Sequence, residues 1–363
     1  MDATHTSTLQ PARGASVWKG TDFARDDSWL HRLTPAQANA LVDAARRWDG
    51  RDFRSLGRDE AASALETLVP TAHAVRTELG DRGFALVRGV PIDALTDGQI
   101  QLAYWAVGLL FGQGLTQNAK ADFLCPVTDM GVDFGYSGDA SQRNVRGYQS
   151  KADLNYHCDP TDVVALLCVR KALSGGLSTI VSTPAIFNEI LRDHPQHLPV
   201  LLNGLRYDRK AEQWSGEEPV SERIPVFAQH GARVSCRYAR SYIIGGAQKT
   251  QPLSDAQQAA LDCFDAIACR ADMPLHMAFE PGDIQLLNNY TVVHGRTAYE
   301  DDADPTRRRF LWRLWLHLDA QAPWCDESEI MRWAFARFGN LGRSVDEWNK
   351  LAETIGENRA AVF

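Results

Sequence analysis

An imidazole and a carboxylate stand two positions apart just before a long apolar run. His157 and Asp159 belong to the segment Asn-Tyr-His-Cys-Asp-Pro at residues 155–160, and residues 163–169 that follow are apolar. In extended backbone, side chains two positions apart project from the same face, with Cys158 turned to the other. One imidazole and one carboxylate are two thirds of a facial iron site, which needs one further His. Because the chain has ten His residues, this pair alone is a weak signal.

A third candidate ligand and two arginines follow in the last quarter of the chain. His294 comes soon after a segment that predicts a strand, and Arg309 and Arg313 lie in the apolar run after it. Period-two geometry places Arg309, Leu311 and Arg313 on one face of a strand. Arginines on the inner face of an apolar strand are costly without partners. A bound anion, gripped by two parallel hydrogen bonds, satisfies them. A structural ion pair with a buried Asp or Glu is the open alternative for either arginine.

Composition and charge narrow the classes of protein. The 363 residues are 44% hydrophobic and 23% charged, with a net charge of −8. This acidic balance argues against nucleic acid and anionic membranes as partners held by bulk charge. No apolar run approaches a membrane span, and the N-terminus lacks the basic and apolar regions of a secretory signal. The seven cysteines form no C-x-x-C pair, which is typical of reduced thiols and predicts a cytoplasmic protein.

Helical periodicity dominates the first third of the chain. Residues 1–20 are polar and aperiodic and predict a loose arm. Helices are expected at residues 34–48, at 58–79 with a break or kink at Pro70, and at 95–110, with a strand at 83–89 between them. From residue 111 to 150 glycine and amide residues interrupt the pattern. This stretch is either an interdomain linker or a loop over a site, and the strands that resume after it favour a lid.

Short strands dominate the rest of the chain. Strands are expected at 163–169, 178–182, 225–228, 233–238, 276–280, 283–288 and 309–318. Helices are expected at 183–192 and 253–271, and the tail over residues 327–363 has a helical pattern. We therefore predict an α+β fold with a mainly β core, a sandwich or jelly roll, extended by an N-terminal helical section. Residues 21–363 form a single domain, with the core at about 150–318.

These motifs together resemble a known enzyme family. The order His157-x-Asp159, Gly175-Gly176-x-Ser178, His294 and Arg309-x-x-x-Arg313 is similar to the iron(II)/2-oxoglutarate dioxygenases of the taurine dioxygenase (TauD/TfdA-like) group, over residues 80–318. The resemblance implies a double-stranded β-helix core, with His157, Asp159 and His294 as the iron(II) ligands. It implies that Arg309 holds the distal carboxylate of 2-oxoglutarate. Arg313 would lie near the cosubstrate and the anionic end of the substrate. Ser178 replaces the family's usual threonine but keeps the hydroxyl for the cosubstrate.

The expected function is hydroxylation of a small anionic substrate, such as a carboxylate, amino acid or sulfonate, with 2-oxoglutarate and O₂ consumed and succinate and CO₂ released. A desaturase or ring-forming oxidase would share the same residues. A cupin-like metalloprotein that does not use 2-oxoglutarate, and a non-enzymatic jelly-roll module with a structural metal, are the rivals. The retained carboxylate of Asp159 disfavours a halogenase. Structural zinc sites normally have a fourth protein ligand, and no obvious one appears here.

Candidate substrate-binding residues are less sharply indicated. Arg240 interrupts a strand-like stretch and is either a ligand for a substrate carboxylate or an ordinary surface arginine. Asn155 precedes the first ligand, where the loop over the site would meet the substrate. Arg313 is the third candidate, by the resemblance. The identity of the substrate and the oligomeric state, a homodimer included, stay open.

Overall fold

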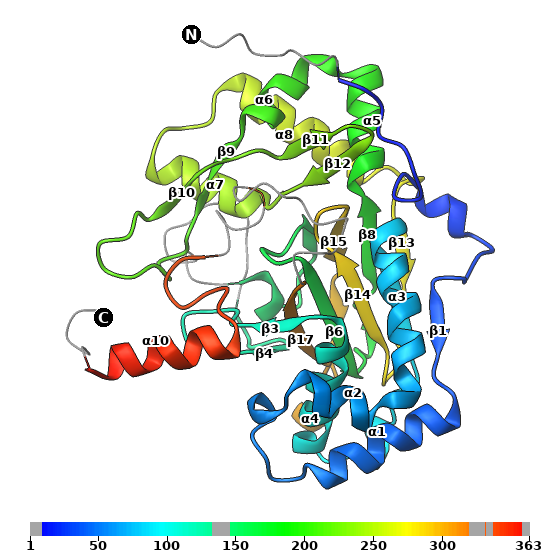
Figure 1. The fold of residues 1–363 in the computed structure, drawn as a ribbon. Coiled ribbons are helices and arrows are strands. Elements are labelled where there is room, and N and C mark those ends of the chain that lie inside the picture. Colours follow the sequence, from blue (N-terminus) through cyan, green and yellow to red (C-terminus); the bar gives the residue numbers. More distant parts are fainter. Residues whose placement is uncertain (1–8, 133–145, 319–330, 332–336, 358–363) are drawn as a thin grey trace.

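The computed structural model describes residues 9–132, 146–318, 331 and 337–357, and it shows a mixed α/β fold in stacked layers (Figure 1). Two β-sheets lie at the centre. Helices from the first third of the chain cover one outer side, and helices from the middle of the chain cover the other. The chain therefore has one central pair of sheets around which every other element is placed.

The larger sheet has seven strands and is mostly antiparallel. Its path is β1-β2-β14-β6-β17-β3, and β4 pairs with β17 beside β3. The strands are β1 (Leu30–Arg32), β2 (Phe84–Arg88), β3 (Gln113–Leu115), β4 (Leu124–Val127), β6 (Val163–Arg170), β14 (Ile284–Asn288) and β17 (Phe310–His317). Long apolar strands such as β6 are buried on both faces, as expected for a sheet covered on both sides.

The smaller sheet has four strands in the order β13-β8-β15-β5. They are β5 (Leu154–His157), β8 (Ser178–Ser182), β13 (Leu275–Met277) and β15 (Val292–Arg296). A hydrophobic cluster joins the two sheets: Phe84, Val164 and Leu287 of the larger sheet pack with Ile180 and Val292 of the smaller one. This shared cluster is the inner core.

Helices form the outer layers. The layer over the larger sheet comprises α1 (Pro35–Arg47), α2 (Arg58–Ala64), α3 (Val69–Asp81) and α4 (Asp97–Phe111). The layer over the smaller sheet includes α5 (Thr183–Asp193), α6 (Leu198–Asn203), α7 (Arg240–Lys249) and α8 (Asp255–Ala268). Three two-stranded ribbons complete the described strands: β7 (Ser174–Gly175) with β16 (Tyr299–Glu300), β9 (Leu205–Asp208) with β10 (Val220–Ile224), and β11 (Phe227–His230) with β12 (Arg233–Cys236).

Helix boundaries follow the local signals closely. Thr34 caps α1 with Pro35 at its first position, as predicted. The expected break at Pro70 is confirmed, since α2 ends at Ala64 and Pro70 lies in the first turn of α3. The helical tail is confirmed only in α10 (Val345–Glu357), because most of residues 327–336 lie outside the described part of the chain.

The predicted loop at 111–150 is wrong in its first half. Within it, β3 and β4 pair with β17 and so belong to the larger sheet. The strands are three and four residues long. Such short segments, which contain glycine and Pro126, show no clear strand periodicity in the sequence. They become strands because they pair with β17. Residues 133–145 lie outside the described part, so a lid there stays a prediction.

The loose arm is also wrong for the residues that the structure describes. Trp18 is buried and donates from its indole Nε1 to the carbonyl of Arg82 at 2.8 Å. Ala12 is buried too, and its N–H donates to Asn188 Oδ1 at 2.7 Å. A single large aromatic side chain can anchor an aperiodic segment, because burying it removes a large apolar area from water.

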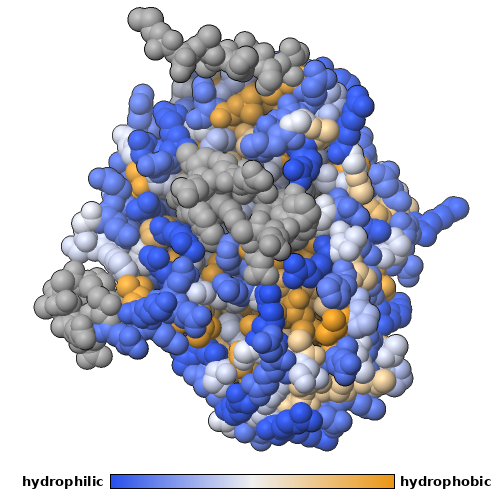
Figure 2. All heavy atoms as spheres, viewed as in Figure 1, coloured by the Kyte–Doolittle hydropathy of each residue, from blue (hydrophilic) through white to orange (hydrophobic). Residues whose placement is uncertain are grey.

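None of the helices in the described part of the chain is both long enough and apolar enough to span a membrane. Met130 and Leu173 are the large hydrophobic side chains left exposed in the described part. The face shown in Figure 2 is mostly hydrophilic, with smaller hydrophobic patches between.

A buried carboxylate joins the end of β17 to the start of β6. Asp162 accepts hydrogen bonds from Tyr290 Oη at 2.7 Å, His317 Nδ1 at 2.7 Å and the N–H of Leu318 at 2.9 Å. Burial raises the pKa of Asp162, but the bonds from His317 and Tyr290 outweigh it and bring the pKa down to about 2. The ionised form therefore stabilises the fold.

We expect Asp162→Asn to lower the free energy of unfolding by about 2–4 kcal/mol near neutral pH, because charge-assisted bonds are lost. The pKa is lower in the folded than in the unfolded chain. The carboxylate's contribution is therefore complete above about pH 3.8 and lost as the pH falls towards 2. Urea unfolding of parent and variant should give a difference that shrinks over this range. Asp43→Asn, on the exposed face of α1, is the control. A constant difference would contradict the assignment.

Candidate active site

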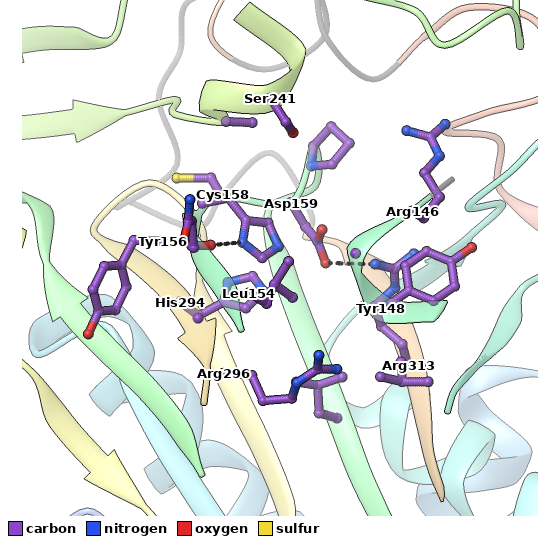
Figure 3. Close-up of a pocket in the computed structure, with 18 of the residues that line it drawn as sticks. Arg146, Tyr148, Leu154, Tyr156, Cys158, Asp159, Ser241, His294, Arg296 and Arg313 are labelled. Carbon is purple, nitrogen blue, oxygen red and sulfur yellow. Dashed lines mark hydrogen bonds and ion pairs between the residues drawn. The ribbon is translucent and has the colours of Figure 1, made fainter. Parts of the chain in front are cut away.

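Two histidines face each other across neighbouring strands. β5 and β15 pair in antiparallel fashion, and their register places His294 opposite His157. Opposed residues project to the same side of a sheet, and the two ring centroids are 4.3 Å apart. His294 follows the strand predicted at 283–288, which is β14, and itself lies within the next strand, β15, which the sequence had not predicted. The pairing brings together two imidazoles that are far apart in the sequence (Figure 3).

Asp159 completes the group from the turn after β5. Its main-chain N–H donates to Asn289 Oδ1 at 3.0 Å, which fixes the backbone at this position. Its Oδ2 accepts from Trp315 Nε1 at 2.9 Å and lies 3.5 Å from Arg313 Nη1. The carboxylate is therefore held by its backbone and by one of its oxygens, and it points into the cavity (Figure 3).

Cys158, between the two, takes no part in this group. It is buried, and its Sγ lies 3.9 Å from the carbonyl oxygens of Cys236 and Val292. The alternation predicted for residues 157–159 is confirmed.

The three side chains suit a divalent metal ion. One donor atom from each of His157, Asp159 and His294 lies within 4.8 Å of the others. Burial lowers the pKa of His157, and burial together with the neighbouring His157 lowers that of His294 to about 3, so both imidazoles are neutral. Burial raises the pKa of Asp159, but the charge of Arg313 and the hydrogen bond from Trp315 contribute to a net lowering of this pKa, so the carboxylate is ionised. Neutral imidazoles and an ionised carboxylate are the forms that bind metal.

A hydrogen bond to the main chain orients the imidazole of His157. His157 Nδ1 lies 2.8 Å from the carbonyl oxygen of Asn155 and donates to it, which leaves Nε2 with its lone pair towards the cavity. His294 Nδ1 is buried without a hydrogen-bonding partner in the described residues. Two imidazoles and one carboxylate match the donor set of non-haem iron(II) oxygenases.

Arg309 lies deep in the same cavity. It is 4% exposed, and its Nη1 has no hydrogen-bonding partner in the described part of the chain. Burial lowers its pKa, and no described carboxylate forms an ion pair with it. The predicted parity is confirmed, since Arg309, Leu311 and Arg313 are buried while Phe310 and Trp312 are partly exposed. A buried guanidinium with a free N–H group suits an anion that enters the cavity.

Arg313 has partners within the protein. Its Nε donates to Gln117 Oε1 at 2.8 Å, and its guanidinium stacks over the rings of Tyr148 and Trp315. With Nη1 directed at Asp159, two of its three nitrogens are engaged. The structure therefore places Arg313 as a support for the Asp159 carboxylate as well as a lining residue.

The Gly175-Gly176 motif allows β7 to approach β16 closely. A Cβ at Gly175 would lie 2.2 Å from the carbonyl oxygen of Ala298, and one at Gly176 would lie 3.2 Å from Arg309 Nε. Both residues have positive φ angles, 72° and 67°, which glycine adopts without strain. Ser178 follows in β8, buried and lining the cavity, and its hydroxyl donates to Gln285 Oε1 at 3.0 Å.

The two remaining candidates differ from expectation. Arg240 begins α7 and is not part of a strand-like stretch. Although it lines the cavity, its guanidinium pairs with Asp262 at 2.5 Å and Asp265 at 2.6 Å on α8. Because these two acidic residues of α8 already engage the guanidinium of Arg240, it is not available to bind a substrate carboxylate. Asn155 lines the cavity and contributes the carbonyl that orients His157.

Several lining residues were missed by the sequence analysis. Gln117 supports Arg313 from the segment taken for a loop. Trp315 has the parity of Arg309 and Arg313, so its inward direction was available from the pattern. Arg296 stands two residues after His294 on the same face of β15, and its register partner is Ser178. That spacing was a usable signal for a further cation in the cavity.

The cavity is strongly cationic although the protein is acidic. Of the described residues that line it, the carboxylate is Asp159, and the cations are Arg146, Lys210, Arg240, Arg296, Arg309 and Arg313. Apolar residues such as Leu311 and Phe279 fill the space between them. A metal-binding triad beside basic residues, in a cavity with partly apolar walls, suits an oxygenase that acts on small anions.

The chain belongs to the family described as taurine catabolism dioxygenase TauD, TfdA family, whose sequence profile matches residues 54–315. It is 31% identical to FR-33289 synthase of Streptomyces rubellomurinus over 331 residues, which cover 89% of this chain and 95% of that protein. It is 29% identical to a uridine-5'-phosphate dioxygenase of a Streptomyces species over 160 residues, which cover 43% of this chain and 55% of the relative. The protein is accordingly an iron(II)- and 2-oxoglutarate-dependent oxygenase.

Solved structures share its fold. Asparagine oxygenase, in complex with Fe(II), 2S,3S-3-hydroxyasparagine and succinate, superimposes with a TM-score of 0.62 at 16% identity, covering 87% of this chain and 100% of that one. The non-haem iron oxygenase OrfP, in complex with Fe and alpha-ketoglutaric acid, gives a TM-score of 0.59 at 16% identity, covering 86% and 99%. The two-sheet architecture is therefore that of non-haem iron oxygenases.

We expect Trp315→Phe to weaken metal binding about 10- to 100-fold, because the indole N–H that orients Asp159 is lost while the aromatic ring is kept. Anaerobic iron(II) titration of the purified protein measures this. Trp312→Phe, on the partly exposed face of the same strand, should bind iron(II) like the parent. Equal affinity in all three proteins would show that the indole does not orient the ligand.

Proposed function

We propose that the enzyme hydroxylates a small anionic molecule, coupled to conversion of 2-oxoglutarate and O₂ to succinate and CO₂. The observation that carries this proposal is the position of His157, Asp159 and His294 within a cavity lined by six cations and one carboxylate. Carboxylates of the protein engage Arg240 and Arg313, whereas no described carboxylate pairs with Arg309, so positive charge remains in the cavity for an anion.

Iron(II) is held by His157, Asp159 and His294 in this proposal. The bound metal, with 2-oxoglutarate and O₂, supplies the oxidising power needed to attack a C–H bond. The protein's own residues keep both imidazoles neutral, hold the carboxylate in one orientation and exclude bulk water from most of the cavity. We further propose that the two facing sheets are a double-stranded β-helix, in the sense of a jelly roll with staggered strands.

Arg309 binds the distal carboxylate of 2-oxoglutarate. Its unpartnered Nη1 and its burial support this role over a structural ion pair, since no described carboxylate pairs with it. Ser178 lies beside Arg296 in the register, and its hydroxyl, which here donates to Gln285 Oε1, turns to donate to the same carboxylate when 2-oxoglutarate binds. Arg313 holds Asp159 and adds positive charge near the cosubstrate. A metalloprotein that does not use 2-oxoglutarate has no need of Arg309 in this form.

The names of the relatives agree with a small anionic substrate. The uridine-5'-phosphate dioxygenase is named for a small phosphate-bearing molecule. A relative from Stachybotrys chartarum, 27% identical over 206 residues, is called taurine hydroxylase-like. A desaturase or ring-forming oxidase would use the same residues, so product analysis separates these outcomes.

The six cysteines in the described part are free thiols, which supports a cytoplasmic location.

Consumption of 2-oxoglutarate in air tests the function. The purified protein should release succinate only with added iron(II), and a true substrate should increase the rate and gain one oxygen atom. His294→Ala should abolish turnover while its far-ultraviolet circular dichroism stays that of the parent. Turnover at the parent rate in this variant would refute the assigned metal site.

Arg309→Lys tests the cosubstrate role. Lysine keeps the charge but loses the two-pronged geometry, so 2-oxoglutarate affinity should fall about 10- to 100-fold, equivalent to one charge-assisted bond. The visible charge-transfer absorbance of the anaerobic iron(II) complex follows binding. Arg170→Lys, whose guanidinium packs on Phe310 at the other face of the strand, should bind 2-oxoglutarate like the parent. Unchanged 2-oxoglutarate affinity in Arg309→Lys, together with a large loss of thermal stability, would show a structural arginine instead.

A further inference from the structure

One short segment of the chain contacts both sides of the proposed metal site. Residues 236–239 join the end of β12 to α7 (Figure 1). The N–H of Cys158, which stands between two of the proposed ligands, donates to the carbonyl of Tyr238 at 2.7 Å. The N–H of Cys236 donates to the carbonyl of Tyr290 at 2.7 Å, in the turn between β14 and β15. The segment therefore connects the ligand-bearing residues to that turn.

Arg237, within this segment, is packed against the same turn. Its side chain is buried, since the residue is 1% exposed. Its Nη1 donates to the carbonyl of Asn289 at 3.1 Å, and its guanidinium carbon lies 4.0 Å from the centre of the Tyr290 ring. Its Nε donates to the carbonyl of Met331 at 2.7 Å. Arg237 therefore holds two neighbouring residues of the turn between β14 and β15.

The surroundings of Arg237 do not give it an acidic partner. Within the described part of the chain, its hydrogen bonds go to main-chain carbonyls and not to a carboxylate, and its Nη2 lacks a hydrogen-bonding partner. Burying a cation without a carboxylate costs free energy, and apolar residues of similar volume often replace buried charges without loss of stability. What the guanidinium adds is direction, because its planar group aims a fixed N–H at one carbonyl. Stability alone therefore does not account for Arg237.

Asn289 transmits this constraint to a metal ligand. Its Oδ1 accepts from the N–H of Asp159 at 3.0 Å, whereas its Nδ2 has no hydrogen-bonding partner in the described residues. Because no second hydrogen bond orients this side chain, its position depends on its main chain. Arg237 holds the carbonyl of Asn289, and the N–H of Asn289 donates to the carbonyl of Asp162 at 3.0 Å. A shift of the Asn289 main chain would therefore move the amide group that fixes Asp159.

We propose that Arg237 is a positioning residue of the metal site: it sets the position of Asn289 and, through Asn289, the direction of Asp159. This inference rests on the proposed function, because it requires Asp159 to bind iron(II). Arg237 acts on the ligand only through Asn289, since it is not among the described residues that line the cavity.

Anaerobic titration with iron(II), followed by calorimetry, tests this role. Asn289→Ala removes the acceptor of the Asp159 N–H and should weaken iron(II) binding about 10- to 100-fold. Arg237→Met removes the directed N–H groups but keeps much of the side-chain volume, and it should weaken iron(II) binding about tenfold. The double variant should bind iron(II) like Asn289→Ala, because Arg237 has no effect on the ligand once the Asn289 amide is gone.

Arg88→Met is the matched control, since it is the same substitution at a different buried contact. Arg88 of β2 donates to both carboxylate oxygens of Asp283 at 2.7 Å, and its loss leaves that buried carboxylate unpaired. The thermal midpoint of metal-free Arg88→Met should therefore fall more than that of Arg237→Met, whereas its iron(II) affinity should equal the parent's. A merely structural role of Arg237 would not separate stability from metal affinity in this way.

A second variant at the same position guards against misfolding. Arg237→Lys keeps the charge but has fewer and less directed N–H groups, so its iron(II) affinity should lie between those of the parent and Arg237→Met. Far-ultraviolet circular dichroism establishes that each variant is folded. If Arg237→Met does not fold, parental iron(II) affinity in Arg237→Lys would by itself overturn the positioning role.

Three further results would overturn it. These are parental iron(II) affinity in folded Arg237→Met, losses of affinity that multiply in the double variant, and a loss in Arg88→Met as large as that in Arg237→Met. Failure of the proposed function gives a different result: the parent would not bind iron(II), or His294→Ala would bind it as tightly as the parent.

Discussion

The site depends on the antiparallel pairing of β5 with β15. This register places His157 opposite His294, and a slip of one residue would turn one imidazole to the other face of the sheet. The neighbouring pairing of β15 with β8 fixes Arg296 opposite Ser178 in the same way. Hydrogen-bonded strands buried by outer helices cannot slip without exposing their apolar side chains. The rigidity of the sheets is therefore what keeps the ligand atoms in place.

Supporting residues from distant parts of the chain then hold Asp159, which lies outside the regular strands. Asn289 fixes its backbone, and Trp315 and Arg313 fix its carboxylate. Gln117 holds Arg313 in turn. Each of these contacts orients a group that would otherwise turn freely. They are needed at Asp159 because it is the one member of the triad that does not lie in a strand. Outer contacts of this kind orient metal ligands and tune their basicity.

Much of the site could be predicted from the sequence, because alternation along a strand is local. The parity of Arg309, Leu311 and Arg313 needed only the spacing of residues, and the structure confirms it. The partners of Arg240 and Arg313 could not be predicted, since Asp262 and Gln117 reach them through the tertiary fold. The strands β3 and β4 were missed for the same reason: β17, almost 200 residues further on, defines them. Local patterns give the direction of a side chain, and only the fold gives its partner.

The burial of Arg309 links the binding of an anion, which we propose to be the cosubstrate, to the stability of the fold. No carboxylate in the described part of the chain pairs with this buried guanidinium, and its Nη1 lacks a hydrogen-bonding partner there, so its lost hydration is only partly replaced and the fold is less stable than it could be. An anion that binds there restores the missing bonds and stabilises only the folded chain. The part of the cavity around Arg309 is therefore organised for an anion before the anion arrives, and little of the binding free energy is spent on rearranging the protein.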